Sequence, residues 1–181
     1  MKKIPYILLI LVTVFFSCKR QEPTGKVILP NDREIIAEKE AFFTGNKKIL
    51  QLEKDEIELF VQRYGWNMKE SSTGLWYQIL EKGEGKNPKE GDKIEIEYEM
   101  ILLTGEKIDD SEEKGVMCFV LEKSGDLIGL HEAVKMLKEG GKARFIIPSH
   151  LGYGTIGDGE KIEGSTPFVI IVKCLKIKST N

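Results

Sequence analysis

Histidine is scarce in this sequence, and the common phosphate-binding and nucleophile motifs are missing. The 181 residues include two histidines, His131 and His150, which lie in unrelated contexts. There is no Gly-rich phosphate loop, no pair of histidines at metal-ligand spacing and no Gly-x-Ser-x-Gly elbow. We therefore predict that the protein uses no cofactor and no metal. Both histidines are interpreted as surface or helix-capping residues.

Basic residues are not in excess, and cysteines are few. Lys and Arg number 27 against 29 Asp and Glu, which gives a formal net charge of −2. Because binding to nucleic-acid phosphates depends on clustered basic side chains, we expect no nucleic-acid partner. Cys118 and Cys174 both lie in apolar runs. They could pair in an oxidising compartment, but buried free thiols are the favoured interpretation.

The N-terminal segment has the composition of a secretory leader. Lys2 and Lys3 precede the apolar stretch Ile4–Phe16, which is shorter than the ~20 residues that a membrane-spanning helix needs. Ser17-Cys18 closes the stretch and resembles the end of a bacterial lipobox, in which the cysteine is acylated. We predict that residues 1–17 form a lipoprotein signal peptide and that Cys18 is lipidated. An ordinary signal peptide that contains a cysteine is the alternative.

Residues 18–32 are predicted to form a lipidated tether. They include Pro23, Gly25 and Pro30 among polar residues and show no sustained hydrophobic period. No acidic run of the kind that would suggest export to the cell surface follows Cys18. We expect the protein to lie in the cell envelope, lipid-anchored in the outer membrane and facing the periplasm.

Residues 33–66 are predicted to form a helical appendage that is separable from a domain over residues 67–181. A first helix is expected from Glu34 to Phe43, with Thr44-Gly45-Asn46 ending it. The segment from Ile49 to Tyr64 has apolar residues mostly at three- and four-residue spacing, which predicts a second helix. We expect the resulting hairpin to pack on the domain or to join two copies in a homodimer.

From Thr73 onward the sequence pattern changes to strands. The segment Lys93–Met100 alternates strictly, with Ile94, Ile96, Tyr98 and Met100 on one face, which is typical of a half-buried strand in an antiparallel sheet. Further strands are expected over residues 75–80, 116–121, 142–147 and 168–177. One short helix, with Leu130, Ala133, Val134 and Leu137 on its apolar face, ends at Gly140-Gly141. This order predicts an α+β fold in which the helix covers one face of the sheet.

Aromatic and apolar residues that could line a pocket are spread between Tyr98 and Ile170. Asp109 and Tyr153 are the polar groups that stand out, which suggests an apolar pocket with few polar contacts. Taken alone, however, Asp109-Asp110-Ser111 is typical of a turn in which side chains bind local amides.

Several motifs together resemble a known family. Residues 105–111, 118–121, 127–130, 141–149 and 151–154, preceded by Tyr98, occur in the order and spacing seen in FKBP-type peptidyl-prolyl isomerases. The similarity covers roughly residues 75–177. The lipobox, the charged helices and residues 65–75 further resemble the isomerase lipoproteins associated with gliding motility.

The resemblance implies an antiparallel sheet wrapped around one short helix, preceded by the helical hairpin. It implies catalytic pocket roles for Tyr98, Asp109, Phe119 and Tyr153, and substrate-binding roles for Ile108, Met117, Leu127, Leu130, Ile162 and Ile170. Leu130 stands where the family usually has tryptophan, and Ile162-Glu163 stands where an Ile-Pro pair is usual. The implied substrates are proline-containing polypeptides. The alternative is a binding module or chaperone with little isomerase turnover.

The predicted anchor can be tested at one position. Replacing Cys18 with Ala removes the only acceptor for the acyl chains, each of which contributes about 0.8 kcal/mol per buried CH2 to membrane binding. We expect Cys18→Ala to release the protein from the membrane fraction or to stall its processing, as measured by fractionation and intact mass. Unchanged retention and mass would rule the assignment out.

Overall fold

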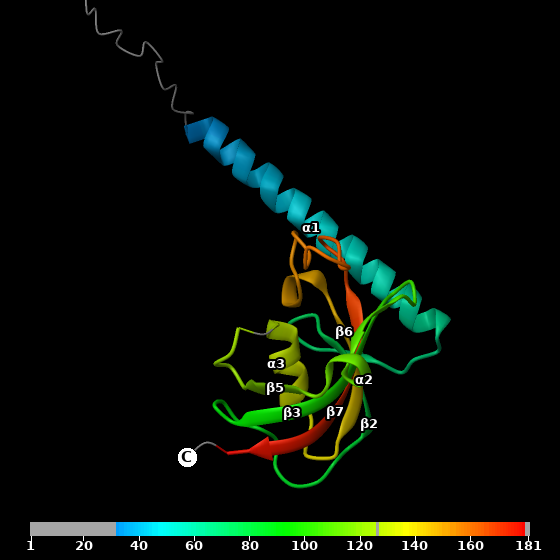
Figure 1. The fold of residues 1–181 in the computed structure, drawn as a ribbon. Coiled ribbons are helices and arrows are strands. Elements are labelled where there is room, and N and C mark those ends of the chain that lie inside the picture. Colours follow the sequence, from blue (N-terminus) through cyan, green and yellow to red (C-terminus); the bar gives the residue numbers. More distant parts are fainter. Residues whose placement is uncertain (1–31, 126, 180–181) are drawn as a thin grey trace, which may run out of the picture. The chain divides into compact units, whose positions relative to one another are not determined.

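The structure is a computed structural model that describes residues 32–125 and 127–179 (Figure 1). The predicted signal peptide, its Cys18 and the tether up to residue 31 lie outside these residues. The chain divides into two compact units, Met1–Lys39 and Glu40–Asn181. The second unit contains the sheet, its helices and the last turns of the first helix.

The N-terminal helical hairpin was predicted wrongly. The structure has one continuous helix, α1 (Asp32–Arg63), and the predicted break at Thr44-Gly45-Asn46 lies inside it (Figure 1). The Thr44 hydroxyl donates to the carbonyl of Glu40, four residues earlier, at 2.8 Å and so does not cap a new helix. A single glycine costs a helix only about 1 kcal/mol relative to alanine, and the good helix formers on both sides offset that cost.

In the described part of the chain, seven strands form one antiparallel sheet. Their order is β1-β2-β6-β7-β3-β4, and β5 also pairs with β3. The strands are β1 (Lys69–Glu70), β2 (Trp76–Glu81), β3 (Lys93–Leu102), β4 (Lys107–Asp110), β5 (Met117–Val120), β6 (Lys142–Ile147) and β7 (Phe168–Lys178). The five strands predicted from the sequence are confirmed. The additional strands β1 and β4 are short, which leaves little alternating pattern to read.

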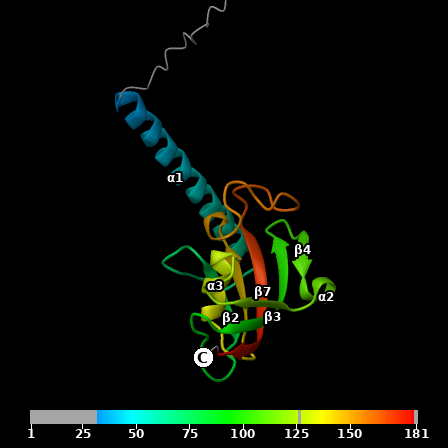
Figure 2. The same ribbon diagram turned by 60° about the vertical axis from the view of Figure 1, so that its left-hand side comes forward.

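Among the described residues, three short helices accompany the sheet: α2 (Ser111–Lys114), α3 (Ile128–Lys135) and the 3-10 turn η1 (Ser149–Leu151). The predicted short helix corresponds to α3, which buries Leu130, Ala133 and Val134. It lies along one face of the sheet (Figures 1 and 2). The predicted α+β architecture, an antiparallel sheet around one short helix, is therefore confirmed. Helix α2, at the β4 edge of the sheet, was not predicted (Figure 2).

The two faces of the sheet carry separate cores. Phe145, Ile147, Phe168 and Ile170 belong to the core beneath α3. The alternate residues Ile146 and Val169 contact a second core on the opposite face, because successive side chains of a strand point to opposite sides. Helix α1 supplies Ile57, Phe60 and Val61 to that second core. The packing therefore places the turns of α1 that carry Ile57, Phe60 and Val61 against the sheet. The predicted domain boundary at residue 66 stays a prediction.

Strand β3 changes partner along its length. Residues 93–96 pair with β5, and residues 99–101 pair with β4. Tyr98 lies between the two stretches, and the Ser111 side chain takes the place of a strand there. Its hydroxyl accepts the Tyr98 N–H at 3.1 Å and donates to the Tyr98 carbonyl at 3.2 Å. These bonds pair the N–H and the carbonyl of Tyr98 and so fix the position of its backbone, from which the side chain extends.

The contribution of α1 to the domain can be measured at Ile57, which is 1% exposed. Ile57→Ala should lower the free energy of unfolding by about 2–5 kcal/mol, because it removes buried methyl groups and leaves a cavity. Leu50→Ala, on the same helix at a position that is 45% exposed, should cost less than about 1 kcal/mol. Chemical denaturation of both variants checks this, and equal costs would show that α1 is not part of the core.

Candidate active site

Nine of the ten residues to which the sequence assigns pocket roles lie in one cluster. Tyr98, Ile108, Phe119, Leu130, Ile162 and Ile170 are buried in it, and Met117, Leu127 and Tyr153 pack against it partly buried. They come from β3, β4, β5, the α3 region, the loop after η1 and β7. The tenth residue, Asp109, is hydrogen-bonded to Tyr98. The fold thus assembles the predicted set from six separate segments, while the binding role of each residue stays a prediction.

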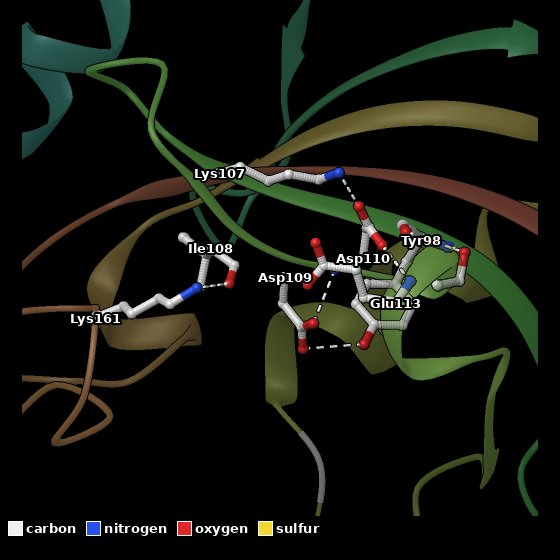
Figure 3. Close-up of polar contacts among 8 residues, drawn as sticks. Tyr98, Lys107, Ile108, Asp109, Asp110, Glu113 and Lys161 are labelled. Atoms are coloured by element: carbon white, nitrogen blue, oxygen red, sulfur yellow. Dashed lines mark hydrogen bonds and ion pairs between the residues drawn. The ribbon is translucent and has the colours of Figure 1, made fainter.

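Asp109 is the carboxylate of this cluster, and three donors hold it, two of which, Tyr98 and Asp110, are labelled in Figure 3. The Tyr98 hydroxyl donates to Oδ2 at 3.0 Å, and the Lys114 ammonium lies 3.0 Å from the same oxygen. The Asp110 N–H donates to Oδ1 at 2.8 Å. Burial raises the pKa of Asp109, but the bonds from Lys114, Tyr98 and Asp110 outweigh it, so the pKa lies below its usual value. Asp109 is therefore an ionised, fully engaged carboxylate near neutral pH.

Tyr98 stays protonated over the same range. Burial, followed by the hydrogen bond to Asp109, raises its pKa to about 12. Its hydroxyl hydrogen is committed to the carboxylate, so the pair acts as a fixed dipole beside the apolar side chains.

The side chains of Asp110 and Ser111 bind nearby backbone groups, as the sequence suggests for a turn in this segment. Asp110 Oδ1 accepts the Glu113 N–H at 2.8 Å and caps α2. Its other oxygen, Oδ2, pairs with Lys107 (Figure 3). Two adjacent carboxylates thus have different roles: Asp109 faces the cluster, and Asp110 holds the turn.

Lys114 was missed by the sequence interpretation. It reaches Asp109 only because the one-turn helix α2 brings it back toward β4, and that helix was not predicted. A signal was present, since Asp110 followed three residues later by Glu113 has the spacing of a helix N-cap.

Two donors in the cluster lack partners. Among the described residues, neither the Tyr153 hydroxyl nor the Leu127 N–H has a hydrogen-bond acceptor. Tyr153 packs against Phe168 with ring centroids 5.6 Å apart. Burial, followed by the charges of Asp158 and Asp109, raises its pKa, so the hydroxyl remains a donor. Both groups are available to a carbonyl oxygen of a ligand.

The loop after η1 is fastened beside the cluster. Asp158 Oδ1 accepts the N–H groups of Glu160, Lys161 and Ile162 at 2.8–2.9 Å, which turns Ile162 inward. The Lys161 ammonium donates to the carbonyl of Ile108 at 2.6 Å and ties the loop to β4 (Figure 3). Asp158 and Lys161 therefore shape the wall that Ile108 and Ile162 form.

One of the two histidines was interpreted wrongly. His131 is 8% exposed, its ring meets that of Phe119 edge-on at 5.3 Å, and its Nδ1 accepts the Glu122 N–H at 3.1 Å. It is buried because it follows Leu130 on the inner side of α3. His150 is exposed, as predicted, and its Nε2 contacts the carbonyl of Thr73 at 2.8 Å.

The cysteine interpretation is half right. Both described cysteines are free, but only Cys174 is buried. Burial raises the pKa of its thiol to about 11, so it is an inert core residue. Cys118 is exposed because, at its position in β5, alternation turns its side chain away from the core that holds Phe119.

Comparisons with known proteins agree with this site. Residues 84–175 match the family described as FKBP-type peptidyl-prolyl cis-trans isomerase. The chain is 40% identical over 111 residues to a probable FKBP-type peptidyl-prolyl cis-trans isomerase FkpA of Neisseria meningitidis, covering 61% of this chain and 40% of the relative. It is 38% identical over 105 residues to FkpA of Escherichia coli K12, covering 58% of this chain and 37% of the relative.

Solved structures extend the likeness to the fold. The crystal structure of FkpA from Escherichia coli aligns with a TM-score of 0.63 and 30% identity over 84% of this chain and 75% of that chain. A peptidyl-prolyl cis-trans isomerase from Pseudomonas syringae aligns with a TM-score of 0.62 and 26% identity over 74% and 96%.

An antiparallel sheet around one helix, with an apolar cluster and a tyrosine-bound carboxylate between them, is an FKBP-like arrangement. The chain belongs to the FKBP-type peptidyl-prolyl cis-trans isomerase family. It spans about 40% of the length of the two FkpA relatives named above. In the described part of the chain, no helix is long and apolar enough to cross a membrane, and no group of acidic, histidine or cysteine side chains could hold a metal ion.

The ionisation of Asp109 makes a prediction about pH. Because its pKa is lower in the folded protein, its contribution to stability is present above the unfolded value of about 3.9 and is lost as pH falls through the folded pKa. The stabilities of the wild type and Asp109→Asn should therefore differ by a constant amount between about pH 5 and pH 9. The difference should shrink below about pH 4. Denaturation at a series of pH values checks this, and a difference that persists in strong acid would refute it.

Proposed function

We propose that this protein catalyses the cis-trans isomerisation of X-Pro peptide bonds in polypeptides. The observation that carries the proposal is the apolar cluster that holds an ionised Asp109 bound to Tyr98 together with two donors, the Tyr153 hydroxyl and the Leu127 N–H, which have no acceptor among the described residues. Family membership supports the same activity.

The reaction suits such a site because it requires no acid-base or covalent chemistry. Amide resonance sets a barrier of ~18–20 kcal/mol to rotation of the bond, although the trans form of X-Pro is only slightly preferred. The planar amide is more polar than the twisted one. An apolar site therefore disfavours the planar state relative to the transition state.

Each part of the cluster has a role in this mechanism. Ile108, Phe119, Leu130 and Ile170 would hold the proline ring. The Leu127 N–H and the Tyr153 hydroxyl would bind carbonyl oxygens on either side of it. Asp109 would act through the electric field of its carboxylate and by orienting the Tyr98 side chain. It is a poor general base, because its pKa is lowered and three donors already occupy it.

Leu130 makes the floor of the site aliphatic. It is 2% exposed and occupies the position where the family usually has tryptophan. An aliphatic floor lacks the flat ring face on which a proline ring can stack. We expect this protein to bind proline rings through shape and apolar contact rather than through aromatic stacking.

We further propose that the protein is a lipoprotein of the cell envelope, anchored through Cys18, which assists the folding of exported polypeptides. The support is the sequence of residues 1–18, with its charged start, apolar stretch and terminal cysteine. Clients that belong to the gliding machinery are part of this proposal, on the resemblance to gliding-associated isomerase lipoproteins. The Cys18→Ala variant tests the anchor.

A second candidate function is a binding module or chaperone with little turnover that self-associates through α1. Ile49, Leu52 and Leu59 are exposed on this helix at spacings of three and seven residues, which is the repeat of a helix-helix seam. Sedimentation of the whole chain and of Leu52→Glu would distinguish a dimer from a monomer. An isomerase assay on the same wild-type protein separates the two functions.

The kinetics of two substitutions test the isomerase site. Tyr153→Phe removes one hydroxyl, and Asp109→Leu removes the carboxylate at similar bulk. Each should lower kcat/KM for a prolyl peptide by up to about tenfold, the equivalent of one hydrogen bond of about 0.5–1.5 kcal/mol. Asp109→Leu should cost more than Tyr153→Phe if its field also positions Tyr98.

Thermal unfolding of both variants provides the control, since Tyr153→Phe should leave the midpoint nearly unchanged. Full activity in both variants would place the site elsewhere. A lower midpoint without a specific kinetic loss would make these residues structural only.

A further inference from the structure

One buried carboxylate connects α1 to the loop that carries Tyr153. Glu53 is 4% exposed, and both of its oxygens bind Ser149. Oε2 accepts the Ser149 N–H at 2.9 Å, and Oε1 accepts the Ser149 hydroxyl at 2.5 Å. Within residues 32–125 and 127–179, Glu53 takes part in no ion pair. Its neighbour Lys54 pairs with Glu70 of β1 instead.

A buried carboxylate without a cation is a costly way to join two elements. Its desolvation is unfavourable, and hydrogen bonds from the protein only partly offset it. An apolar side chain of similar volume would join α1 to the loop without that cost. Hydrogen bonds, unlike apolar contacts, are directional. The two bonds from Ser149 to Glu53 therefore restrict Ser149 to one position relative to α1.

Ser149 in turn fixes the residues around Tyr153 through its carbonyl group. Its carbonyl accepts the N–H of Gly152 at 2.9 Å and the N–H of Gly154 at 2.8 Å. These two glycines flank Tyr153 in the sequence. The turn has little room to move, since a Cβ on Gly152 would lie 2.8 Å from Phe168 Cε1. Four hydrogen bonds thus centre on Ser149: it donates two to Glu53 of α1 and accepts two from the turn.

We propose that Glu53 is a positioning residue of the active site. It holds Ser149, and through the Ser149 carbonyl it holds the Gly152–Gly154 turn, so that the Tyr153 hydroxyl points at the substrate. This inference rests on the proposed isomerase function. It makes α1, which belongs to the second core through Ile57 and Phe60, a support of the site on the other face of the sheet.

The test is a double-mutant cycle with Glu53→Gln and Tyr153→Phe. Glutamine keeps the side-chain length but replaces one carboxylate oxygen with an NH2 group, so the Ser149 N–H and hydroxyl can no longer each donate to an oxygen of their own on residue 53. Glu53→Gln alone should lower kcat/KM for a prolyl peptide by about three- to tenfold. In the Tyr153→Phe background it should change kcat/KM by less than about twofold, because the hydroxyl that it positions is already absent.

The matched control is Lys54→Gln, which removes the neighbouring ion pair between α1 and β1 and does not touch the loop. It should leave kcat/KM unchanged in both backgrounds. If Glu53→Gln lowers kcat/KM by the same factor in both backgrounds, Glu53 does not act through Tyr153 and the proposal is wrong.

Amide hydrogen exchange tests the link without using activity. Glu53→Gln and Ser149→Ala should both speed exchange at Gly152 and Gly154. Exchange at Gly140 and Gly141, which donate to Cys174 and Lys138, should stay unchanged. Unaltered exchange at Gly152 and Gly154 would overturn the proposal. Faster exchange there in a protein that shows no isomerase activity would retain the link and reject the proposed function.

Discussion

The candidate site depends on one hydrogen bond in apolar surroundings, from the Tyr98 hydroxyl to Asp109. A carboxylate in that position is stable only if donors replace the water it has lost. Tyr98, Lys114 and the Asp110 N–H supply them. Each donor depends on a different part of the fold: β3 carries Tyr98, the capped helix α2 returns Lys114, and β4 ends at Asp110. The pair is therefore a consequence of how β3 changes partners at the sheet edge.

The polar groups of the site divide into those that are satisfied and those that are free. Asp109 and Tyr98 satisfy one another, and Ser111 satisfies the Tyr98 backbone. The Tyr153 hydroxyl and the Leu127 N–H have no acceptor in the described part of the chain. A ligand with carbonyl oxygens flanking an apolar ring complements this arrangement. Asp109 and Tyr98 set the electric field of the site. The Tyr153 hydroxyl and the Leu127 N–H can donate hydrogen bonds to the ligand.

The sheet has a helix on each face, and the two helices serve the site differently. Helix α3 provides Leu130 and packs His131 against Phe119. Helix α1 covers the other face and reaches the Tyr153 loop through Glu53 and Ser149. Close packing on both faces leaves the loop few alternative positions. The N-terminal helix is therefore part of the structural basis of the site.

The sequence by itself determined the family motifs, the five longer strands and the inward face of β3, because a period of two records burial directly along the chain. The family resemblance also implied ten pocket residues, which lie together in the fold, while their binding roles stay predictions. Tertiary structure decided the burial of His131 and the return of Lys114 to Asp109, since the first depends on packing and the second on an element too short to leave a pattern. The continuity of α1 through Gly45 instead follows from the helix formers on both sides of the glycine. Tertiary structure alone decided the contact of Glu53 with Ser149. Those residues are 96 positions apart, and only the folded sheet brings their atoms within a hydrogen bond.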